Sequence, residues 1–320
     1  MRIGIVTPAF NVAAYIGDAV RSVLAQTHPC WTMTIVDDGS TDTTAGIVAG
    51  FADRRIRLIS QRNAGVSVAR NRGLAAMDVA AVLFLDADDW LDPDALSALA
   101  AALRTAPDAV AAVGPYRRVA CAIEGPNGRP IMGFRSGKTC YPAAGDLLKS
   151  LLVRNLFANG GHLLIRRPVL ETAGPFRADL CYGEDWEYWV RLAGLGSFAA
   201  AASRAPLLFV RERHDSAYRS MALRPESFVP CMDAIFNAPA PRSRFTEVEL
   251  ARLRRRAEAE NDWVVGRELI RHGQVANGRR FLRRSMSAAP SFRRMALLTA
   301  ASLPLPRIGP FRAYPLPDSV

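Results

Sequence analysis

The feature that most constrains the fold is an apolar run that ends in three carboxylates, Val82-Leu83-Phe84-Leu85-Asp86-Ala87-Asp88-Asp89-Trp90. A continuous apolar run is typical of a strand that is buried on both faces, as in a parallel sheet covered by helices. Open α/β sheets bind their ligands at the carboxyl ends of the strands. The segment therefore predicts a buried strand that ends at Asp86, with a binding site directly after it.

The three acids also indicate what is bound there. Carboxylates this close together raise one another's pKa unless a positive charge lies between them. Mg²⁺ or Mn²⁺, held by one or two carboxylates and otherwise by substrate phosphates, supplies such a charge. The alternative is a solvated loop, because Asp92-Pro93-Asp94 has the composition of a helix start.

Strands and helices alternate along the first third of the chain. The expected strands are residues 3–7, 33–36, 56–59 and 109–113, together with one that ends at Asp86. The expected helices are residues 66–76 and 93–103, together with one that has its N-cap at Asn11 and its apolar positions between Ile16 and Leu24. Pro8 is expected to end the first strand. This alternation predicts an α/β fold with a mostly parallel, Rossmann-like sheet flanked by helices. Three of the strand ends deliver polar or acidic residues to the same edge, which is the predicted site.

The rest of the chain has a different character. Residues 114–146 are rich in glycine and proline, 184–195 read as a helix, and 246–289 read as two arginine-rich helices broken near Gly273. Pro239 and Pro241 mark a boundary. We therefore expect a catalytic domain over residues 1–220, with halves at 1–113 and 114–220, and a helical extension over 221–320.

Charge and cysteine content narrow the class of protein. The net charge is +11, and residues 241–320 alone contribute +9, with 16 arginines against seven acids. No recognisable nucleic-acid module accompanies this charge, so we expect no nucleic-acid partner. An anionic membrane surface suits the arginine-rich helices, and a merely solvated helix face is the alternative. Five scattered cysteines without a C-x-x-C pair fit a reducing cytoplasm, and the strand that starts at Ile3 leaves no room for a signal peptide.

Six separated blocks follow one another in a specific order. They are Ile5-Val6-Thr7-Pro8-Ala9-Phe10-Asn11, Ile35-Val36-Asp37-Asp38-Gly39-Ser40-Thr41-Asp42, Asn63-Ala64-Gly65 with Ala69-Arg70-Asn71, Phe84-Leu85-Asp86-Ala87-Asp88-Asp89, Gly160-Gly161-His162 with Arg166, and Glu184-Asp185-Trp186. Together they closely resemble the inverting family 2 glycosyltransferases of the GT-A fold, over about residues 1–220.

The resemblance implies a site for a nucleotide-diphospho sugar. The residues that it assigns to nucleotide-sugar binding are Thr7, Pro8, Asp37, Asp38, Asn63, Arg70 and Asp86. In this set Asp38 would accept a hydrogen bond from the base, and Arg70 would reach the nucleotide or its phosphates. The implied ligands of Mn²⁺ or Mg²⁺ are Asp88, Asp86 and His214, with Asp89 as an additional or substitute contact. A turn-and-cap role is the alternative for Asp37 and Asp38.

On the acceptor side, the resemblance implies that Asp185 is the catalytic base and that Glu184 supports it. Direct displacement at the anomeric carbon needs a carboxylate to take the proton of the incoming hydroxyl. Helix capping is the alternative, since acids at a helix start also meet the macrodipole favourably. Trp186 and His162 are the implied acceptor contacts, and core packing is the alternative for both.

The expected function is metal-dependent, inverting transfer of a sugar, with a UDP-sugar as the default donor, to a hydroxyl of a glycan or lipid-linked acceptor. The setting would be cell-surface polysaccharide synthesis in the cytoplasm, with peripheral attachment to the inner face of the plasma membrane. A dehydrogenase and a Walker-type NTPase are excluded, because neither G-x-G-x-x-G nor G-x-x-x-x-G-K-[ST] is present. An inactive nucleotide- or glycan-binding homologue and a retaining transferase remain as alternatives.

Overall fold

The computed structural model describes residues 1–120, 135–212 and 225–302. The chain divides into two compact units. The core unit consists of residues 1–148, 155–179 and 184–213, and the helical unit of residues 149–154, 180–183 and 214–320. The predicted boundary at residue 220 lies outside the described residues and stays a prediction, as does the contact of His214 with a metal.

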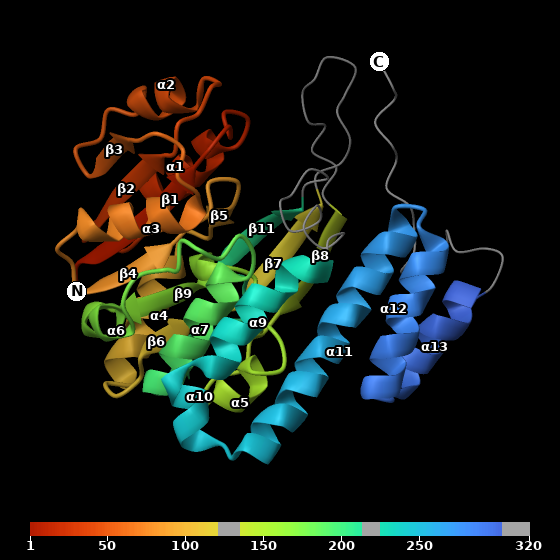
Figure 1. Ribbon diagram of the computed structural model, residues 1–320. Coiled ribbons are helices and arrows are strands. Elements are labelled where there is room, and N and C mark those ends of the chain that lie inside the picture. The colour runs from red at the N-terminus through yellow and green to blue at the C-terminus, as the bar shows by residue number, and fades with distance from the viewer. Residues whose placement is uncertain (121–134, 213–224, 303–320) are drawn as a thin grey trace, which may run out of the picture. The chain divides into compact units, whose positions relative to one another are not determined.

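The core unit is built on a seven-stranded sheet with the order β10-β6-β9-β4-β1-β2-β3 (Figure 1). Only β9 runs against its neighbours, so the predicted mostly parallel sheet is confirmed. The strands are β1 (Ile3–Ala9), β2 (Trp31–Asp37), β3 (Ile56–Ser60), β4 (Ala81–Phe84), β6 (Ala111–Val113), β9 (Leu163–Arg166) and β10 (Phe198–Ala200).

A second sheet of four short strands has the order β5-β11-β7-β8. Its strands are β5 (Trp90–Leu91), β7 (Tyr116–Ala120), β8 (Arg135–Cys140) and β11 (Leu208–Glu212). β5 directly follows the acidic segment, and its partner β11 comes from the far end of the core unit. This sheet therefore begins next to the acidic segment in which the predicted site lies.

Pro8 does not end the first strand, contrary to the prediction, because β1 continues to Ala9. The reason lies in the neighbouring strands. β4 pairs with β1 only from Ile3 to Val6, while β2 pairs with β1 along its whole length. Pro8 therefore lies where β1 is no longer flanked by strands on both sides, and the missing N–H of proline is tolerated there.

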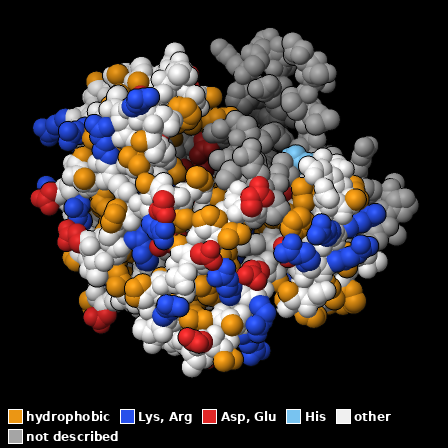
Figure 2. Space-filling view, in the orientation of Figure 1, with side chains coloured by type: hydrophobic (Ala, Val, Ile, Leu, Met, Phe, Trp, Pro, Cys, Tyr) orange, Lys and Arg blue, Asp and Glu red, His pale blue; other side chains and the backbone are white. Residues whose placement is uncertain are grey.

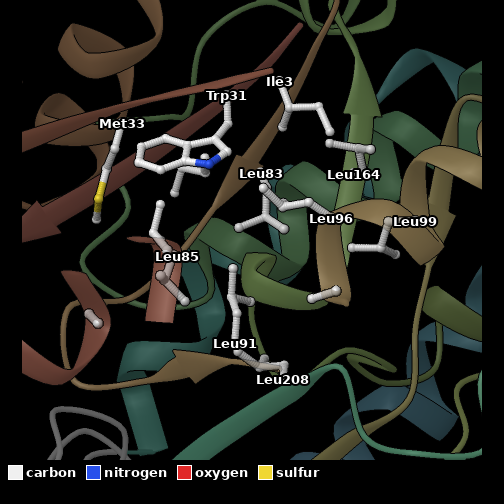
Figure 3. Packing of buried hydrophobic residues seen from close by; sticks show 14 of the residues in the cluster. Ile3, Trp31, Met33, Leu83, Leu85, Leu91, Leu96, Leu99, Leu164 and Leu208 are labelled. Carbon is white, nitrogen blue, oxygen red and sulfur yellow. The ribbon is translucent and has the colours of Figure 1, made fainter. Parts of the chain in front are cut away.

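Helices cover both faces of the large sheet. Those of the core unit are α1 (Ile16–Leu24), α2 (Thr44–Ala49), α3 (Val66–Ala75), α4 (Ala95–Thr105), α6 (Arg167–Ala173) and α7 (Glu184–Leu195), with the one-turn helix η1 (Gly160–His162). Side chains of α1, α2 and α4 pack with Ile3, Met33 and Leu83 on one face of the sheet (Figure 3). On the other face Phe84 contacts Phe176, which stacks on Tyr188 of α7. The alternating side chains of each strand thus bury both faces of the sheet.

The helical unit is all α in its described part, apart from the short segments it takes from earlier in the chain. Its helices are η2 (Pro225–Ser227), α9 (Phe228–Asn237), α10 (Pro239–Arg244), α11 (Glu247–Arg271), α12 (Val275–Ala288) and α13 (Phe292–Ser302), and α5 (Leu148–Leu151) begins at the division between the units. α11 starts with a capping box between Thr246 and Glu249 and ends just before Gly273, as the break in the pattern predicted. No helix in the described ranges is long and apolar enough to cross a membrane.

Candidate functional site

The carboxyl ends of neighbouring parallel strands bring the predicted donor-side residues to one edge of the large sheet. Pro8 on β1 lies in register with Val36 on β2. The backbone N–H of Asp38 donates to the carbonyl of Ala9 at 2.8 Å, and Asp86 follows β4 on the other side of β1. The predicted convergence of these strand ends is therefore confirmed.

Arg70, on α3, connects the two halves of the site. Its Nη2 donates to Oδ1 of Asp86 at 3.0 Å, and its Nη1 donates to Oε1 of Glu184 at 2.9 Å. The side chain is only 7 % exposed. Burial opposes its charge, but the carboxylates of Asp86, Glu184 and Asp185 outweigh burial and raise the pKa of Arg70. A fixed guanidinium thus holds the acid after β4 against the acid at the start of α7.

Asp185 lies beside this ion pair in an unusual electrostatic environment. Its Oδ2 accepts a hydrogen bond from Nδ2 of Asn155 at 3.2 Å, and its Oδ1 accepts from the backbone N–H of Trp186 at 2.6 Å. Burial, together with the neighbouring Glu184, raises the pKa of Asp185 to about 7, although Arg70 pulls it down. A carboxylate that titrates near neutral pH can accept and release a proton, as a general base must.

Asp38 is buried and organises the turn that follows β3. Its Oδ1 accepts from Nε2 of Gln61 at 2.7 Å and from the backbone N–H of Ala64 at 2.9 Å, and its Oδ2 accepts from the N–H of Gly65 at 2.9 Å. This is the turn role that sequence left open as the alternative. The contact of Asp38 with a base stays a prediction.

Gly39 makes this arrangement sterically possible. Its φ is +80°, and a Cβ built on it would lie 2.9 Å from the backbone nitrogen of Asn63. Glycine is therefore needed both for the left-handed conformation and for the close approach of the two backbones. Asp37 caps the turn after β2 that contains Gly39, because its Oδ1 accepts from the N–H of Ser40 at 3.1 Å.

The three acids after β4 have different surroundings. Asp89 is 2 % exposed, and its carboxylate accepts from Nδ2 of Asn159 at 2.5 Å and from the backbone N–H of Arg211 at 2.8 Å. Burial, reinforced by Asp88 and Asp86, raises the pKa of Asp89 well above its usual range. Both oxygens of Asp89 are therefore already used within the protein, and its role as a substitute metal ligand stays a prediction.

Asp86 and Asp88 are the two acids that retain access to solvent at this edge. Oδ2 of Asp86 has no partner in the described part of the chain, since Arg70 binds only Oδ1. Over residues 1–120, 135–212 and 225–302, no group of three or more histidine, cysteine or acidic side chains forms a metal cluster. Mg²⁺ or Mn²⁺ bound through substrate phosphates needs only one or two carboxylates, so the donor set fits such an ion.

Arg211 also belongs to the region of the site, although no motif of the sequence includes it. Its Nε donates to the carbonyl oxygen of Asp88 at 2.8 Å, and its Nη2 pairs with Asp18 of α1 at 2.8 Å. The guanidinium also lies 4.8 Å from the ring centroid of Trp90. Because β11 pairs with β5, the arginine reaches over the acidic segment and fixes its backbone. Asn155 and Asn159 were missed as well, since neither belongs to a motif and only the tertiary structure brings them to Asp185 and Asp89.

The two predicted acceptor contacts are packed in the interior. His162 is completely buried, with Nδ1 2.9 Å from the carbonyl oxygen of Gly114 and Nε2 accepting from the N–H of Ala158 at 3.3 Å. Burial lowers the pKa of His162 to about 4, so the ring is neutral. Trp186 is 5 % exposed. This burial fits the core-packing alternative for both residues, and their contact with an acceptor stays a prediction.

The remaining predicted residues differ in their exposure. Thr7 is fully buried on β1, and its hydroxyl has no hydrogen-bond partner within the described residues. Pro8 is partly exposed and Asn63 is exposed, so both are accessible to a ligand at this edge. The roles of these three residues in nucleotide-sugar binding stay predictions.

Comparison with known proteins gives one family. A model of glycosyl transferase family 2 matches residues 4–172, more than half of the chain. The putative teichuronic acid biosynthesis glycosyltransferase TuaG of Bacillus subtilis is 43% identical over 97 residues, which are 29% of this chain and 38% of TuaG. The chain thus spans well under two thirds of the length of this curated relative.

Solved structures with a similar fold include S. aureus TarS and a mannosyltransferase. The crystal structure of S. aureus TarS 1–349 in complex with UDP-GlcNAc has a TM-score of 0.60 at 20% identity and covers 94% of this chain and 87% of its own. A mannosyltransferase from Pyrobaculum calidifontis, in complex with GDP-Man and Mn²⁺, has a TM-score of 0.56 at 19% identity and covers 97% and 82%. At these identities the likeness shows the fold, and the predicted GT-A-like architecture is confirmed.

Proposed function

The chain belongs to glycosyl transferase family 2, and on that premise we propose that it transfers a sugar from a nucleotide-diphospho sugar to an acceptor hydroxyl with inversion at the anomeric carbon. The observation that supports this most strongly is the bridge made by Arg70 between Asp86 and Glu184. These two acids are almost 100 residues apart in sequence. Their juxtaposition assembles a donor side and an acceptor side around one cation, as a displacement reaction requires.

The donor is proposed to bind along the edge formed by Pro8, Asp37, Asn63 and Asp86. UDP-sugars are the preferred class, since TarS binds UDP-GlcNAc, and GDP-sugars come next, since the Pyrobaculum calidifontis enzyme binds GDP-Man. Arg70 would contribute positive charge near the diphosphate.

Mn²⁺ or Mg²⁺ is proposed to be held by Asp88 and Asp86 together with the phosphates of the donor. The ion would stabilise the negative charge that grows on the leaving nucleoside diphosphate. The buried Asp89 and the contact of Arg211 with the Asp88 carbonyl support this assignment, because they fix the backbone that carries both ligands. His214 is retained as a proposed additional ligand.

Asp185 is proposed as the general base. Its raised pKa and its hydrogen bond from Asn155 suit a carboxylate that takes the proton of the incoming hydroxyl. Glu184 would hold Arg70 in position and keep the environment of Asp185 electronegative. An acid in this role predicts inversion, because a single displacement places the acceptor opposite the leaving group.

The acceptor is proposed to be a glycan or a lipid-linked oligosaccharide in cell-surface polysaccharide synthesis. TuaG is named for teichuronic acid biosynthesis, which supports this setting. A cytoplasmic location, with peripheral attachment to the inner face of the plasma membrane through the arginine-rich helices, completes the proposal.

Calorimetry with UDP, GDP and dTDP, each with Mn²⁺ and with EDTA, tests the donor site. We expect metal-dependent binding of one nucleotide that is lost in Asp88→Ala and retained in Asp108→Ala, an exposed acid before β6 at the other end of the strands. Nucleotide affinity that is the same with Mn²⁺ and with EDTA, and the same in the wild type and in Asp88→Ala, would contradict the metal site. Absence of any nucleotide binding would favour an inactive homologue.

The stereochemistry of the product tests the mechanism. Proton NMR of the fresh product reports its anomeric configuration, which we expect to be opposite to that of the donor. An unchanged configuration would establish a retaining transferase and would leave Asp185 without the role of base.

A further inference from the structure

A basic cavity of about 520 Å³ lies within the helical unit, between α11 and the turn from α12 to α13. Arg252, Arg255 and Arg256 of α11 line one side, and Pro290 and Ser291 line the other. The three arginines are three and four residues apart, so they share one face of α11. All three are exposed, and within the described part of the chain none has a hydrogen-bond or ion-pair partner.

A fourth arginine forms the floor of this cavity and is already neutralised. Arg294 is 11 % exposed and pairs with Glu260, the acid among the lining residues. It also donates to Oγ of Ser285 at 2.9 Å and to the carbonyl of Ala289 at 2.7 Å. The fixed pair therefore shapes the cavity, while the three arginines of α11 leave it with a surplus of positive charge. Guanidinium groups in this number favour a phosphate.

Exposed apolar side chains lie directly beside the cavity. Phe292, the first residue of α13, is 81 % exposed, and Met295, one turn later, is 48 % exposed. Leu297 points the other way and packs with Trp263 and Leu282. Figure 2 shows basic side chains gathered over the C-terminal helices, with hydrophobic side chains exposed at their lower end. The fold thus buries one face of α13 and leaves an aromatic residue in solvent next to a basic cavity.

We propose that this corner docks the chain onto a membrane, with the phosphate of an anionic phospholipid in the arginine cavity and Phe292 inserted at the level of the headgroups. The combination favours a lipid over a soluble phosphate, because a soluble phosphate gains nothing from Phe292 and Met295. Arginines that meet anionic headgroups beside an aromatic side chain are the elements of an interfacial anchor. The proposal gives the peripheral attachment a defined site, and it does not depend on the transferase chemistry.

Vesicle flotation of the full chain tests this site without donor or acceptor. We expect binding to vesicles of phosphatidylcholine with 30 mol% phosphatidylglycerol and none to phosphatidylcholine alone. Each arginine near an anionic surface strengthens binding by about fivefold, so Arg255→Gln/Arg256→Gln should weaken it by about 30-fold. Phe292→Ser should weaken it by about tenfold.

Two matched controls separate the site from general charge and hydrophobicity. Arg280→Gln/Arg283→Gln removes two exposed α12 arginines that line a different cavity, and Val248→Ser removes an apolar side chain that is 79 % exposed on α11. Both should weaken vesicle binding by less than fivefold. Equal losses in the two arginine pairs would overturn the site. Pyrophosphate binding that depends on Arg255 and Arg256, without any vesicle binding, would overturn the assignment to a membrane.

Discussion

Replacement of Asp185 by asparagine should remove catalysis and yet stabilise the protein at alkaline pH. Asparagine keeps the size of the side chain and its ability to accept one hydrogen bond, but it cannot ionise or take a proton. In its proposed role as general base, Asp185 would contribute a factor of about 10² to 10⁴ to the rate. As a part-buried acid beside Glu184, it opposes folding whenever it is charged.

The magnitude follows from the pKa of Asp185, which is about 7 in the folded chain against an ordinary value of 3.8. The stability that this group contributes is fully present below pH 3.8 and is lost as the pH rises through 7. The full difference corresponds to about 4 kcal/mol, and partial exposure of the side chain reduces it to about 2 kcal/mol. Asparagine has only one acceptor oxygen, so the variant loses the hydrogen bond from either Asn155 or Trp186. This loss lowers its free energy of unfolding by about 1 kcal/mol at every pH.

Urea unfolding of the wild type and Asp185→Asn at pH 3.0 and pH 8.5 measures this balance. The variant should be less stable than the wild type by about 1 kcal/mol at pH 3.0 and more stable by about 1 kcal/mol at pH 8.5. Asp108→Asn, an exposed acid, should show no such reversal. Equal destabilisation at both pH values would refute the reasoning and would leave Asp185 as a helix cap.

Three further outcomes follow from the same contacts. Arg70→Met leaves Asp86 and Glu184 without their cation and should lower the free energy of unfolding by about 3 kcal/mol. This is the low end of the range for a buried pair, because both acids are partly exposed. A loss below 1 kcal/mol in urea unfolding would contradict the bridge. His162 has a pKa of about 4, below its ordinary 6.5. Its stabilising contribution is therefore present above pH 6.5, and about 3 kcal/mol is lost as the pH falls through 4. In urea unfolding at a series of pH values, the free energy of unfolding of His162→Gln should fall less steeply toward acid pH than that of the wild type. Gly39→Ala should lower the free energy of unfolding by about 2 kcal/mol, since alanine at a φ of +80° is strained and also clashes with the Asn63 backbone. Thermal unfolding measures this loss. Gly46→Ala is the control, because its Cβ would meet no atom within 4 Å.

The bridge made by Arg70 gives the proposed site one physical centre. The same guanidinium binds Asp86 and Glu184 and lowers the pKa of Asp185 from what burial alone would give. A change at any of these groups therefore alters the charge on the others. Nucleotide affinity and the pH dependence of transfer should accordingly respond together to substitution of Arg70.

The sequence alone predicted the mostly parallel sheet and the edge at which the proposed site lies. Apolar runs that end in Asp37-Asp38 and in Asp86-Ala87-Asp88-Asp89 are typical of buried strands whose ends carry acids, since strands of this composition are covered on both faces. The helical pattern of residues 184–195 likewise gave the bounds of α7 without any tertiary information. These features are local, because they depend on periodicity and on residues that are adjacent in the chain.

Only the tertiary structure decided what each side chain does. Asp88 and Asp89 are neighbours of one residue type, yet Asn159 and the backbone of Arg211 bury the second and leave the first partly exposed. His162 and Trp186 are buried, which their own sequence blocks did not determine. Burial and pairing depend on contacts between residues far apart in sequence, and such contacts form only when the sheets and helices have packed.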